Sequence, residues 1–352
     1  MTLDQVSFLF LDPFCICLRP RSSLKLVMTK FALFVCMTFL HFQPSYAQSF
    51  EFPSFGGPPG PPMKTLRVQG AAYQKSKNTS DDHFTSISPK SIALSVPVII
   101  KDNETWTVGA SYHHFEIGTE SRLKKGTPIP SVFKATQFNV GWSQKESNDR
   151  FWAANLSSGS PSDEPFADEK QLSLNASLIR GLDKQADHQW MLILFYSNNS
   201  SFLRGIPVPG FAYSYFPTKE LRGVFGIPFA FVKWDYHEKW TMMFALMAFQ
   251  KIKFENGYRI FGPAQIAVGI ETDQQVFMRR DRPKEEERFS YEERKVYMTL
   301  KSPLNQSMYA ELNIGHSFDR SFFEVEKYSD RTDNNLNLGN AAYVSAHLTS
   351  RF

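Results

Sequence analysis

Cysteine is scarce in this chain and is confined to its N-terminal end. The 352 residues include three cysteines, which are Cys15, Cys17 and Cys36. If an N-terminal leader is removed, the remaining chain carries no thiol. That excludes a disulfide framework, a cysteine-ligated zinc site and a thiol nucleophile from the remainder. A closed β-barrel has no free sheet edges and does not depend on disulfide bonds for its stability.

Long apolar runs and a strong charge of either sign are also missing. The longest clean apolar run, Phe31 to Leu40, is about half of the ~20 residues that a membrane-spanning helix needs. The formal net charge of the whole chain is +4, and residues 1–47 contribute four basic and two acidic side chains. The sequence therefore predicts neither a helical membrane protein nor a nucleic-acid-binding surface.

Sequence motifs for catalysis or cofactor binding are not found. The chain has no Gly-x-Ser-x-Gly motif, and the glycine-rich stretch at 56–60 lacks the lysine of a phosphate-binding loop. His113 and His114 are adjacent, so in a strand they would point to opposite faces and could not chelate together. We expect no cofactor, no metal and no enzymatic activity.

Residues 28–47 have the organisation of a secretory signal peptide. Met28-Thr29-Lys30 precedes an apolar stretch, and Ser45-Tyr46-Ala47 forms a small-x-small cleavage site before Gln48. We therefore expect cleavage between Ala47 and Gln48. Residues 1–27 are predicted to be a mis-assigned N-terminal extension. The Pro/Gly-rich residues 48–63 are predicted to be a linker, and residues 64–352 an outer-membrane β-barrel.

Aromatic residues and period-2 alternation dominate residues 64–352. Aromatics make up 15% of the chain, with 33 Phe, 13 Tyr and 6 Trp. In 171–178 and 307–317, apolar residues alternate with small or polar ones, as in a strand with one apolar face. A soluble β-sandwich is the alternative to a barrel, but the leader, the missing cysteines and the aromatic content favour the barrel. The predicted lumen-lining residues are Glu311, Asn313, Ser173, Asn175, His347 and Arg351.

The predicted fold is all-β, a transmembrane antiparallel up-and-down β-barrel of about 12 strands, with 14 as the alternative. Fourteen candidate segments can be delimited, and Pro97, Pro228 and Pro263 interrupt three of them. Proline cannot donate a ladder hydrogen bond, so these residues are expected at bulges or strand ends. The charged stretch 279–288 either bridges lipopolysaccharide phosphates or is a solvated loop with internal ion pairs.

The C-terminal strand has the pattern of a barrel-assembly signal. Phe352 ends the chain, and Leu348 and Val344 lie on the same predicted outward face. Ser350 stands where a hydrophobic residue is usual. The barrel-insertion machinery is therefore an expected partner, together with membrane lipid and lipopolysaccharide, and the expected location is the cell outer membrane.

The segment 206–236 carries a further resemblance. It reads IPVPGFAYSYFPTKELRGVFGIPFAFVKWDY, with a Pro-x-Pro-Gly-x-x-Tyr-x-Tyr step followed by Gly-Ile-Pro-Phe. This resembles a family of bacterial outer-membrane β-barrel proteins known as a domain of unknown function, over about residues 64–352. The resemblance implies the barrel and its membrane, and it implies no activity.

Three functions are compatible with these patterns. The first is a passive pore or small-solute transporter of unknown solute, suggested by the polar face. The alternative is a plugged structural or surface-interaction barrel without transport, suggested by Phe322, Phe323 and Tyr328 in a predicted loop at 319–340. An outer-membrane hydrolase is the least favoured.

Overall fold

A computed structural model describes residues 64–352, apart from 200–203, 228 and 248–250. The chain divides into Met1–Gln43 and Pro44–Phe352, and all described residues belong to the second unit. The predicted signal peptide, the cleavage residues Ala47 and Gln48 and the linker 48–63 lie outside the described residues. In the described part, no helix is long and apolar enough to cross a membrane.

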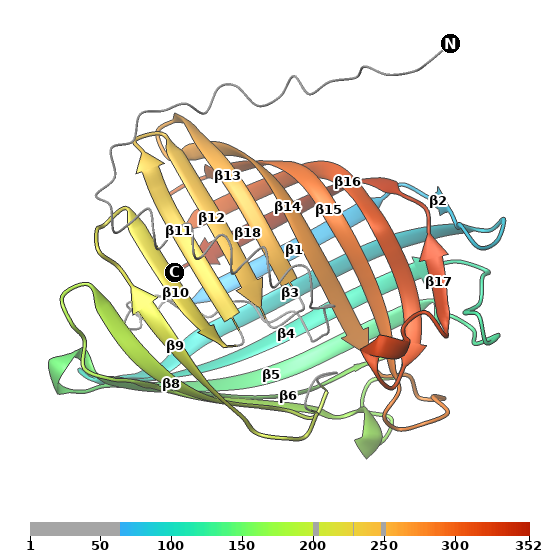
Figure 1. The fold of residues 1–352 in the computed structure, drawn as a ribbon, viewed down its shortest axis with the longest axis horizontal. Helices are drawn as coiled ribbons and strands as arrows, with labels where there is room; N and C mark the ends of the chain where they lie inside the picture. The colour runs from blue at the N-terminus through green and yellow to red at the C-terminus, as the bar shows by residue number, and fades with distance from the viewer. Residues whose placement is uncertain (1–63, 200–203, 228, 248–250) are drawn as a thin grey trace, which may run out of the picture. The chain divides into compact units, whose positions relative to one another are not determined.

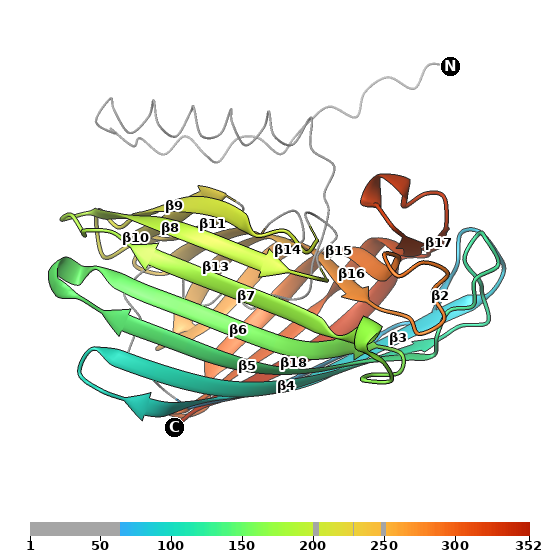
Figure 2. The same ribbon diagram turned by 90° about the horizontal axis from the view of Figure 1, so that it is seen from below.

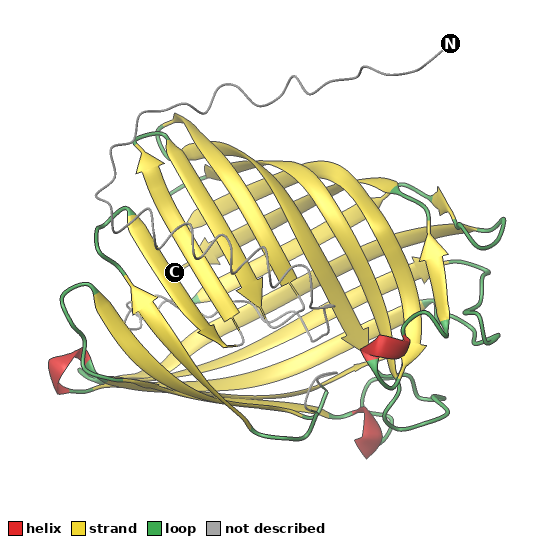
Figure 3. Ribbon diagram, in the orientation of Figure 1, coloured by secondary structure: helices red, strands yellow, loops and turns green. Residues whose placement is uncertain are grey.

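The described chain forms one antiparallel sheet that closes into a barrel (Figures 1 and 3). The closed ring runs through β1, then β3 to β16 in order, then β18, which pairs again with β1. The short strands β2 and β17 stand outside this ring. The strands are β1 Thr65–Tyr73, β2 Ser76–Lys77, β3 Phe84–Ile100, β4 Glu104–Gly118, β5 Val132–Lys145, β6 Phe151–Ser162, β7 Ser173–Gly181, β8 His188–Ser197, β9 Val208–Tyr215, β10 Leu221–Ile227, β11 Phe229–His237, β12 Trp240–Met247, β13 Lys251–Phe261, β14 Ala264–Phe277, β15 Arg288–Pro303, β16 Met308–Val325, β17 Asn335–Leu338 and β18 Ala341–Arg351.

Sixteen strands close the barrel, so the prediction of about 12 strands, with 14 as the alternative, is wrong. The all-β, antiparallel closed barrel is confirmed. The miscount arises where hairpins are tight. The predicted strand 220–234 holds β10 and the first part of β11, and the predicted strands 239–255 and 258–278 together cover β12, β13 and β14. Between β13 and β14 the chain turns within two residues, Gly262, which has a φ of +49°, and Pro263. No polar loop separates the two strands in the sequence.

The predicted role of proline is confirmed at two of the three positions and lies outside the described residues at Pro228. Pro97 stands at a register shift between β3 and β4, and Pro263 stands in the β13–β14 turn. A proline at a bulge or turn leaves no ladder hydrogen bond unmade. Pro97 and Pro263 therefore mark a bulge and a turn rather than lost strands.

The two ends of the barrel differ in their connections. At one end, which we call the turn end, short turns join strands, the longest being 182–187, and the last strand ends there at Arg351. At the other, which we call the loop end, the connections include 119–131, 163–172, 278–287 and 326–340. Three 3-10 helices also occur: η1 Ser147–Asp149 in a turn, and η2 Glu169–Gln171 and η3 Tyr328–Asp330 in loops.

The wall of the barrel is much taller on some strands than on others. β3 and β16 have 17 and 18 residues, whereas β10 and β12 have 7 and 8. At about 3.3 Å per residue, these lengths correspond to roughly 55–60 Å against roughly 25 Å. Because the turn ends of neighbouring strands are joined by short turns, the additional length of the tall strands lies at the loop end (Figure 2).

At the loop end, two tall walls from opposite sides of the ring meet face to face. Six aromatic side chains from β4, β5, β14, β15 and β16 pack together there, and we call them the aromatic seam: Phe115, Phe133, Phe277, Phe289, Tyr291 and Phe322. The ring centroids of Phe133 and Phe277 are 4.5 Å apart, and those of Phe115 and Tyr291 are 5.3 Å apart. Stacked and tilted aromatic pairs at such distances are favourable and exclude water.

Backbone contacts reinforce the seam. The amide of Met278 donates a 2.8 Å hydrogen bond to the carbonyl of Pro161, and Ser162 and Met278 form a parallel β-bridge. β6 therefore touches the end of β14 directly across the barrel. The lumen is closed between these two walls at the loop end.

Candidate functional site

The interior of the barrel divides into arcs of different chemistry. Along the middle of β5, β6 and β7 the inward side chains are mostly small or polar, and Gln137 donates a 2.8 Å hydrogen bond to Ser157. On β13, β14 and β15 the inward positions carry ionisable side chains. We call this set the charged arc: Lys251, Lys253, Glu255, Glu271, Asp273, Glu293, Lys295 and Lys301.

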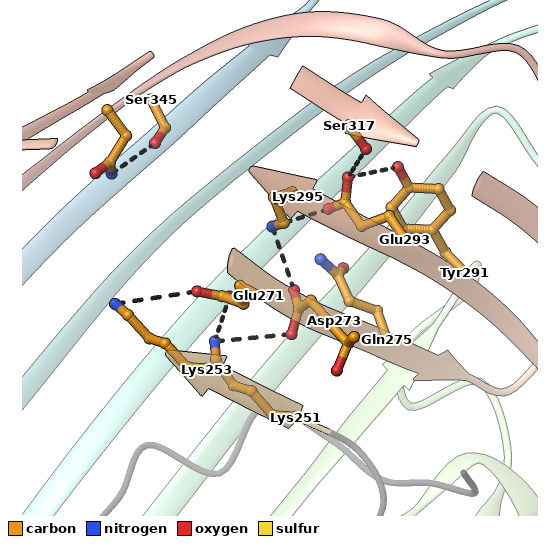
Figure 4. Close-up of polar contacts among 12 residues, drawn as sticks. Lys251, Lys253, Glu271, Asp273, Gln275, Tyr291, Glu293, Lys295, Ser317 and Ser345 are labelled. Carbon is orange, nitrogen blue, oxygen red and sulfur yellow. Dashed lines mark hydrogen bonds and ion pairs between the residues drawn. The ribbon is translucent and has the colours of Figure 1, made fainter. Parts of the chain in front are cut away.

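The charged arc neutralises itself with ion pairs between neighbouring strands (Figure 4). Lys251 Nζ lies 2.9 Å from Glu271 Oε1 and 3.7 Å from Asp273 Oδ1. Lys295 Nζ lies 3.8 Å from Asp273 Oδ2. Further along, Lys301 is paired with Glu255. Four lysines face four carboxylates, so the arc is polar and highly charged without a net charge.

Glu293 is the most enclosed member of the charged arc. Its carboxylate pairs with Lys295 at 2.9 Å and accepts hydrogen bonds from the hydroxyls of Tyr73, Tyr291 and Ser317 at 2.8, 3.1 and 2.6 Å. Only 1% of the Glu293 side chain is exposed. A buried carboxylate is tolerated when it is paired and fully hydrogen-bonded, which this one is.

Just beyond Glu293, toward the seam, lies the buried Arg320. Its guanidinium donates to the Tyr291 hydroxyl at 3.1 Å and to Ser76 Oγ at 3.0 Å. Tyr291 thus belongs to the aromatic seam and to the polar network at once. The dry seam and the charged arc are directly continuous along β15.

The other end of the charged arc meets solvent. The side chains of Lys251 and Lys253 are 32% and 23% exposed, although both point into the barrel. Charged side chains cannot be left in a dry apolar space without a large energetic cost. The interior beside β13 is therefore polar and accessible to water.

A third arc of the interior is apolar. Phe151, Met191, Val224 and Phe229 pack together with Ile179 and Ala212 into one buried cluster on β6 to β11. These side chains occupy inward positions of the shorter strands. The lumen is thus lined by charge on one side and by aliphatic and aromatic side chains on another.

The predicted lumen-lining residues occupy two separate regions of the wall. Glu311 and His347 are register partners on β16 and β18, and Asn313 donates a 3.0 Å hydrogen bond to Ser345 nearby. Ser173 and Asn175 are buried on β7, and Arg351 is exposed at the turn end. Glu311, Asn313 and His347 thus form one group on β16 and β18, and Ser173 and Asn175 form a second group on β7.

The charged arc itself was missed by sequence reasoning, although a signal was present. In 251–255 the sequence Lys-Ile-Lys-Phe-Glu alternates charged and apolar residues, and 293–301 continues in the same way with Lys295 and Lys301. A charge at every second position of consecutive strands indicates a polar face opposite an apolar one. The tight hairpins obscured that these segments are neighbours.

The charged stretch 279–288 ties the loop end together. Arg279 and Glu324 form a buried ion pair at 2.7 Å, Arg280 pairs with Glu164, and Arg288 donates a 2.7 Å hydrogen bond to Asn199. These contacts reach loops and strands on both sides of the seam. The partners Glu324, Glu164 and Asn199 lie outside the stretch, and Arg279 and Arg288 are buried, so these are not the internal pairs of a solvated loop. Contact with lipopolysaccharide phosphates stays a prediction.

The predicted surface loop 319–340 is partly wrong. β16 continues to Val325, and Phe322 and Phe323 are buried. A β-bulge interrupts β16 at this point, because Asp319 has a φ of +49° and the register shifts between Glu292 and Arg294 of the neighbouring strand. Beyond the bulge, the alternate residues of β16 that point into the barrel are even-numbered, and they include Phe322. Phe322 and Phe323 therefore stabilise the barrel end and present no surface to a partner.

The outer surface carries an apolar band bounded by aromatic side chains at the turn end. All six tryptophans of the chain lie near this end, next to exposed apolar residues of the same face: Trp106, Trp142, Trp152, Trp190, Trp234 and Trp240. Glu104 accepts hydrogen bonds from the indoles of Trp106 and Trp142 at 2.8 and 3.1 Å. Such a girdle is typical of a barrel surface where lipid meets water.

The predicted assembly residues lie on this outer surface. Val344 and Leu348 occupy alternate positions of β18 with Val344 45% exposed, and Phe352 is exposed beyond the strand end. Their recognition by insertion machinery stays a prediction.

At the turn end, Arg180 makes a two-point contact with Glu146. Its two terminal nitrogens lie 2.8 Å from the two carboxylate oxygens, and its guanidinium lies 4.6 Å from the centre of the Trp152 ring. The hydrogen bonds from Arg180 lower the pKa of Glu146 below its usual range. No group of three or more metal-ligating side chains occurs among residues 64–352 as far as they are described.

Comparisons with known proteins found likeness only in structure. The COG4313 outer-membrane channel from Pseudomonas putida F1 has 7% identity, covers 86% of this chain and 100% of its own, and has a TM-score of 0.39. The toluene transporter TodX of Pseudomonas putida has 7% identity, covers 88% and 95%, and has a TM-score of 0.37. The translocator domain of the autotransporter NalP from Neisseria meningitidis has 6% identity, covers 94% and 97%, and has a TM-score of 0.31.

No family model and no curated protein matches the chain, so the resemblance to a family of unknown function is not supported by a family match. The structural neighbours named above are an outer-membrane channel, a toluene transporter and the translocator domain of an autotransporter. At these identities and TM-scores, their likeness carries no argument about a solute.

Proposed function

We propose that this chain spans a bacterial outer membrane and acts as a channel for small polar solutes, with its turn end in the periplasm. The observation that carries the proposal is the wet, charged interior of a sixteen-stranded ring. Barrels of about 16 strands are wide enough to enclose an aqueous path, whereas 8-stranded barrels are filled by side chains. The apolar outer band and the tryptophan girdle support the membrane location.

The aromatic seam limits how such a channel conducts. The seam closes the loop end between β4–β6 and β14–β16, so we expect low conductance and infrequent opening. Removal of two opposed rings should widen this end. The test is conductance of refolded protein in planar lipid bilayers, comparing the wild type with the double variant Phe133→Ala/Phe277→Ala.

We expect discrete openings in the wild type and larger or more frequent openings in the double variant. Each truncation costs about 3–5 kcal/mol of core packing, so correct folding of the variant must be checked by heat-dependent gel migration. Phe138→Ala, an outward aromatic on β5, is the matched control and should leave conductance unchanged.

The second candidate function is a plugged structural or surface-interaction barrel, favoured by the same seam. It predicts that the wild type and the folded double variant are both electrically silent at all voltages. That outcome would reject the channel.

A further inference from the structure

A groove crosses the outer surface of the barrel over β15, β16, β18, β1, β3 and β4. Its volume is about 960 Å³. The outward side chains that line it form two adjacent register rows. One row is Leu300, Leu312, Ala346, Gly70, Lys90 and His114, and the other is Ser302, Ala310, Leu348, Val68, Ile92 and Tyr112.

Small outward residues make the groove deep. Gly70, Ala310 and Ala346 lie along its floor, flanked by exposed aliphatic side chains. Gln69 and His347 also line it, although their side chains occupy inward positions of the sheet. A Cβ built on Gly70 would lie 3.9 Å from Lys90 Cγ, which leaves room for a larger residue.

The dimensions of the groove suit a hydrocarbon chain. It crosses six neighbouring strands, and five spacings of about 4.8 Å give a length of about 24 Å. That is enough for an extended fatty acyl chain. Most of the outward side chains along it are aliphatic, and its two ends differ, because Lys90 and His114 lie at the β3–β4 end.

The basic end continues beyond the groove as a row. Lys90, His114 and Lys134 are register partners on β3, β4 and β5 and face outward. On the turn side of this row the outward residues are apolar, beginning with Ile92, and on the loop side polar residues follow, including Glu116. The row thus marks the upper edge of the apolar band, where lipid headgroups would lie.

These lysines are available to an external anion. No salt bridge joins Lys90 or Lys134 to an acidic side chain in the described part of the protein. The hydroxyl of Tyr112 lies 3.4 Å from His114 Nδ1, which places a further polar group at the same level. Glu116 is the acidic residue nearest this row on the same face, and it lies one position further from the apolar band.

We propose that the groove and the basic row bind a phosphorylated acyl lipid of the outer leaflet, of the lipid A class. Its phosphate would contact Lys90 and Lys134, and one acyl chain would lie over Gly70 and Ala346. Lysines at a membrane surface attract lipid phosphates, and a small-residue groove increases the contact area for a chain. The proposal rests on the outer-membrane location, with the loop end outside.

The test is native mass spectrometry of the detergent-purified full chain with added diphosphoryl lipid A. Two variants address the two parts of the site independently: Lys90→Glu/Lys134→Glu removes the phosphate contacts, and Gly70→Leu fills the groove. We expect each to lower the retained lipid by about tenfold. Dipalmitoylphosphatidylcholine, which is zwitterionic, and inorganic phosphate should be retained far less than lipid A.

Matched controls are Lys219→Glu, an exposed lysine of a turn at the opposite end, and Ala154→Leu, an outward small residue on β6. Both should retain lipid A like the wild type. Equal retention by the wild type and both site variants would overturn the proposal, as would equal loss in the controls. Inorganic phosphate bound as strongly as lipid A would also overturn it, because the acyl chain would then contribute nothing. Conductance is measured separately, so failure here leaves the channel proposal standing.

Discussion

Single residues in this barrel show how charge is tolerated inside it. Glu293 is almost fully enclosed, yet it has one lysine and three hydroxyl partners. Lys295 has two carboxylate partners, Glu293 and Asp273, on two strands. Removing one partner of a buried pair costs more than removing both, because it leaves an uncompensated charge.

We therefore predict that Lys295→Met lowers the free energy of unfolding by about 3–5 kcal/mol. The measurement is urea unfolding in detergent, followed by tryptophan fluorescence. Lys253→Met, at a more exposed lysine of the same arc, should cost clearly less. The double variant Glu293→Gln/Lys295→Met should recover part of the loss, and failure to recover any would contradict the pairing.

At the scale of elements, strand ends and connections determine what each face meets. The bulge at Asp319 changes which residues of β16 point inward, so Arg320 and Phe322 join the interior. At the turn end, β7 and the β5–β6 turn are joined by Arg180 and Glu146 beside Trp152. These contacts hold the β5–β6 turn against Trp152 of the tryptophan girdle.

The contact of Glu146 with Arg180 predicts a pH dependence. The pKa of Glu146 is lowered in the folded barrel, so its contribution is complete above the usual glutamate value of about 4.3. It is lost as the pH falls through the lowered pKa. The fluorescence of Trp152 is obtained by subtracting the emission of the Trp152→Phe variant from that of the wild type. We expect this difference to change only below about pH 4. In a Glu146→Gln background this acidic step should be absent, and its persistence would assign the step to another group.

On the scale of the whole molecule, unequal strand lengths allow one ring of strands both to close the barrel and to form the seam at its loop end. The short strands complete the barrel, and the tall ones extend past the apolar band and pack into the seam. The contact of β6 with β14 ties together strands that are far apart around the ring. In the proposed channel, opening of the seam would determine whether the lumen conducts.

A reversible crosslink across the seam tests this directly. β-Bridge partners have Cα atoms close enough for a disulfide, and residues 64–352 contain no cysteine. Placed in the Phe133→Ala/Phe277→Ala background, Ser162→Cys/Met278→Cys should form a disulfide and reduce conductance, and reductant should restore it. A single Ser162→Cys variant is the control. If conductance ignores the redox state, solutes do not pass between these walls.

The sequence by itself determined the fold class, because alternation of apolar and polar residues is a local property that every strand must show if one face is apolar. It also indicated the polar inward faces of β7, β16 and β18. The strand number was not determined, because two-residue turns leave almost no polar signal. The charged arc, the seam and the outer groove were decided only by the tertiary structure. Ring closure and register bring together Phe133 with Phe277, and Gly70 with Ala346, and no local pattern encodes which strands become neighbours or face each other.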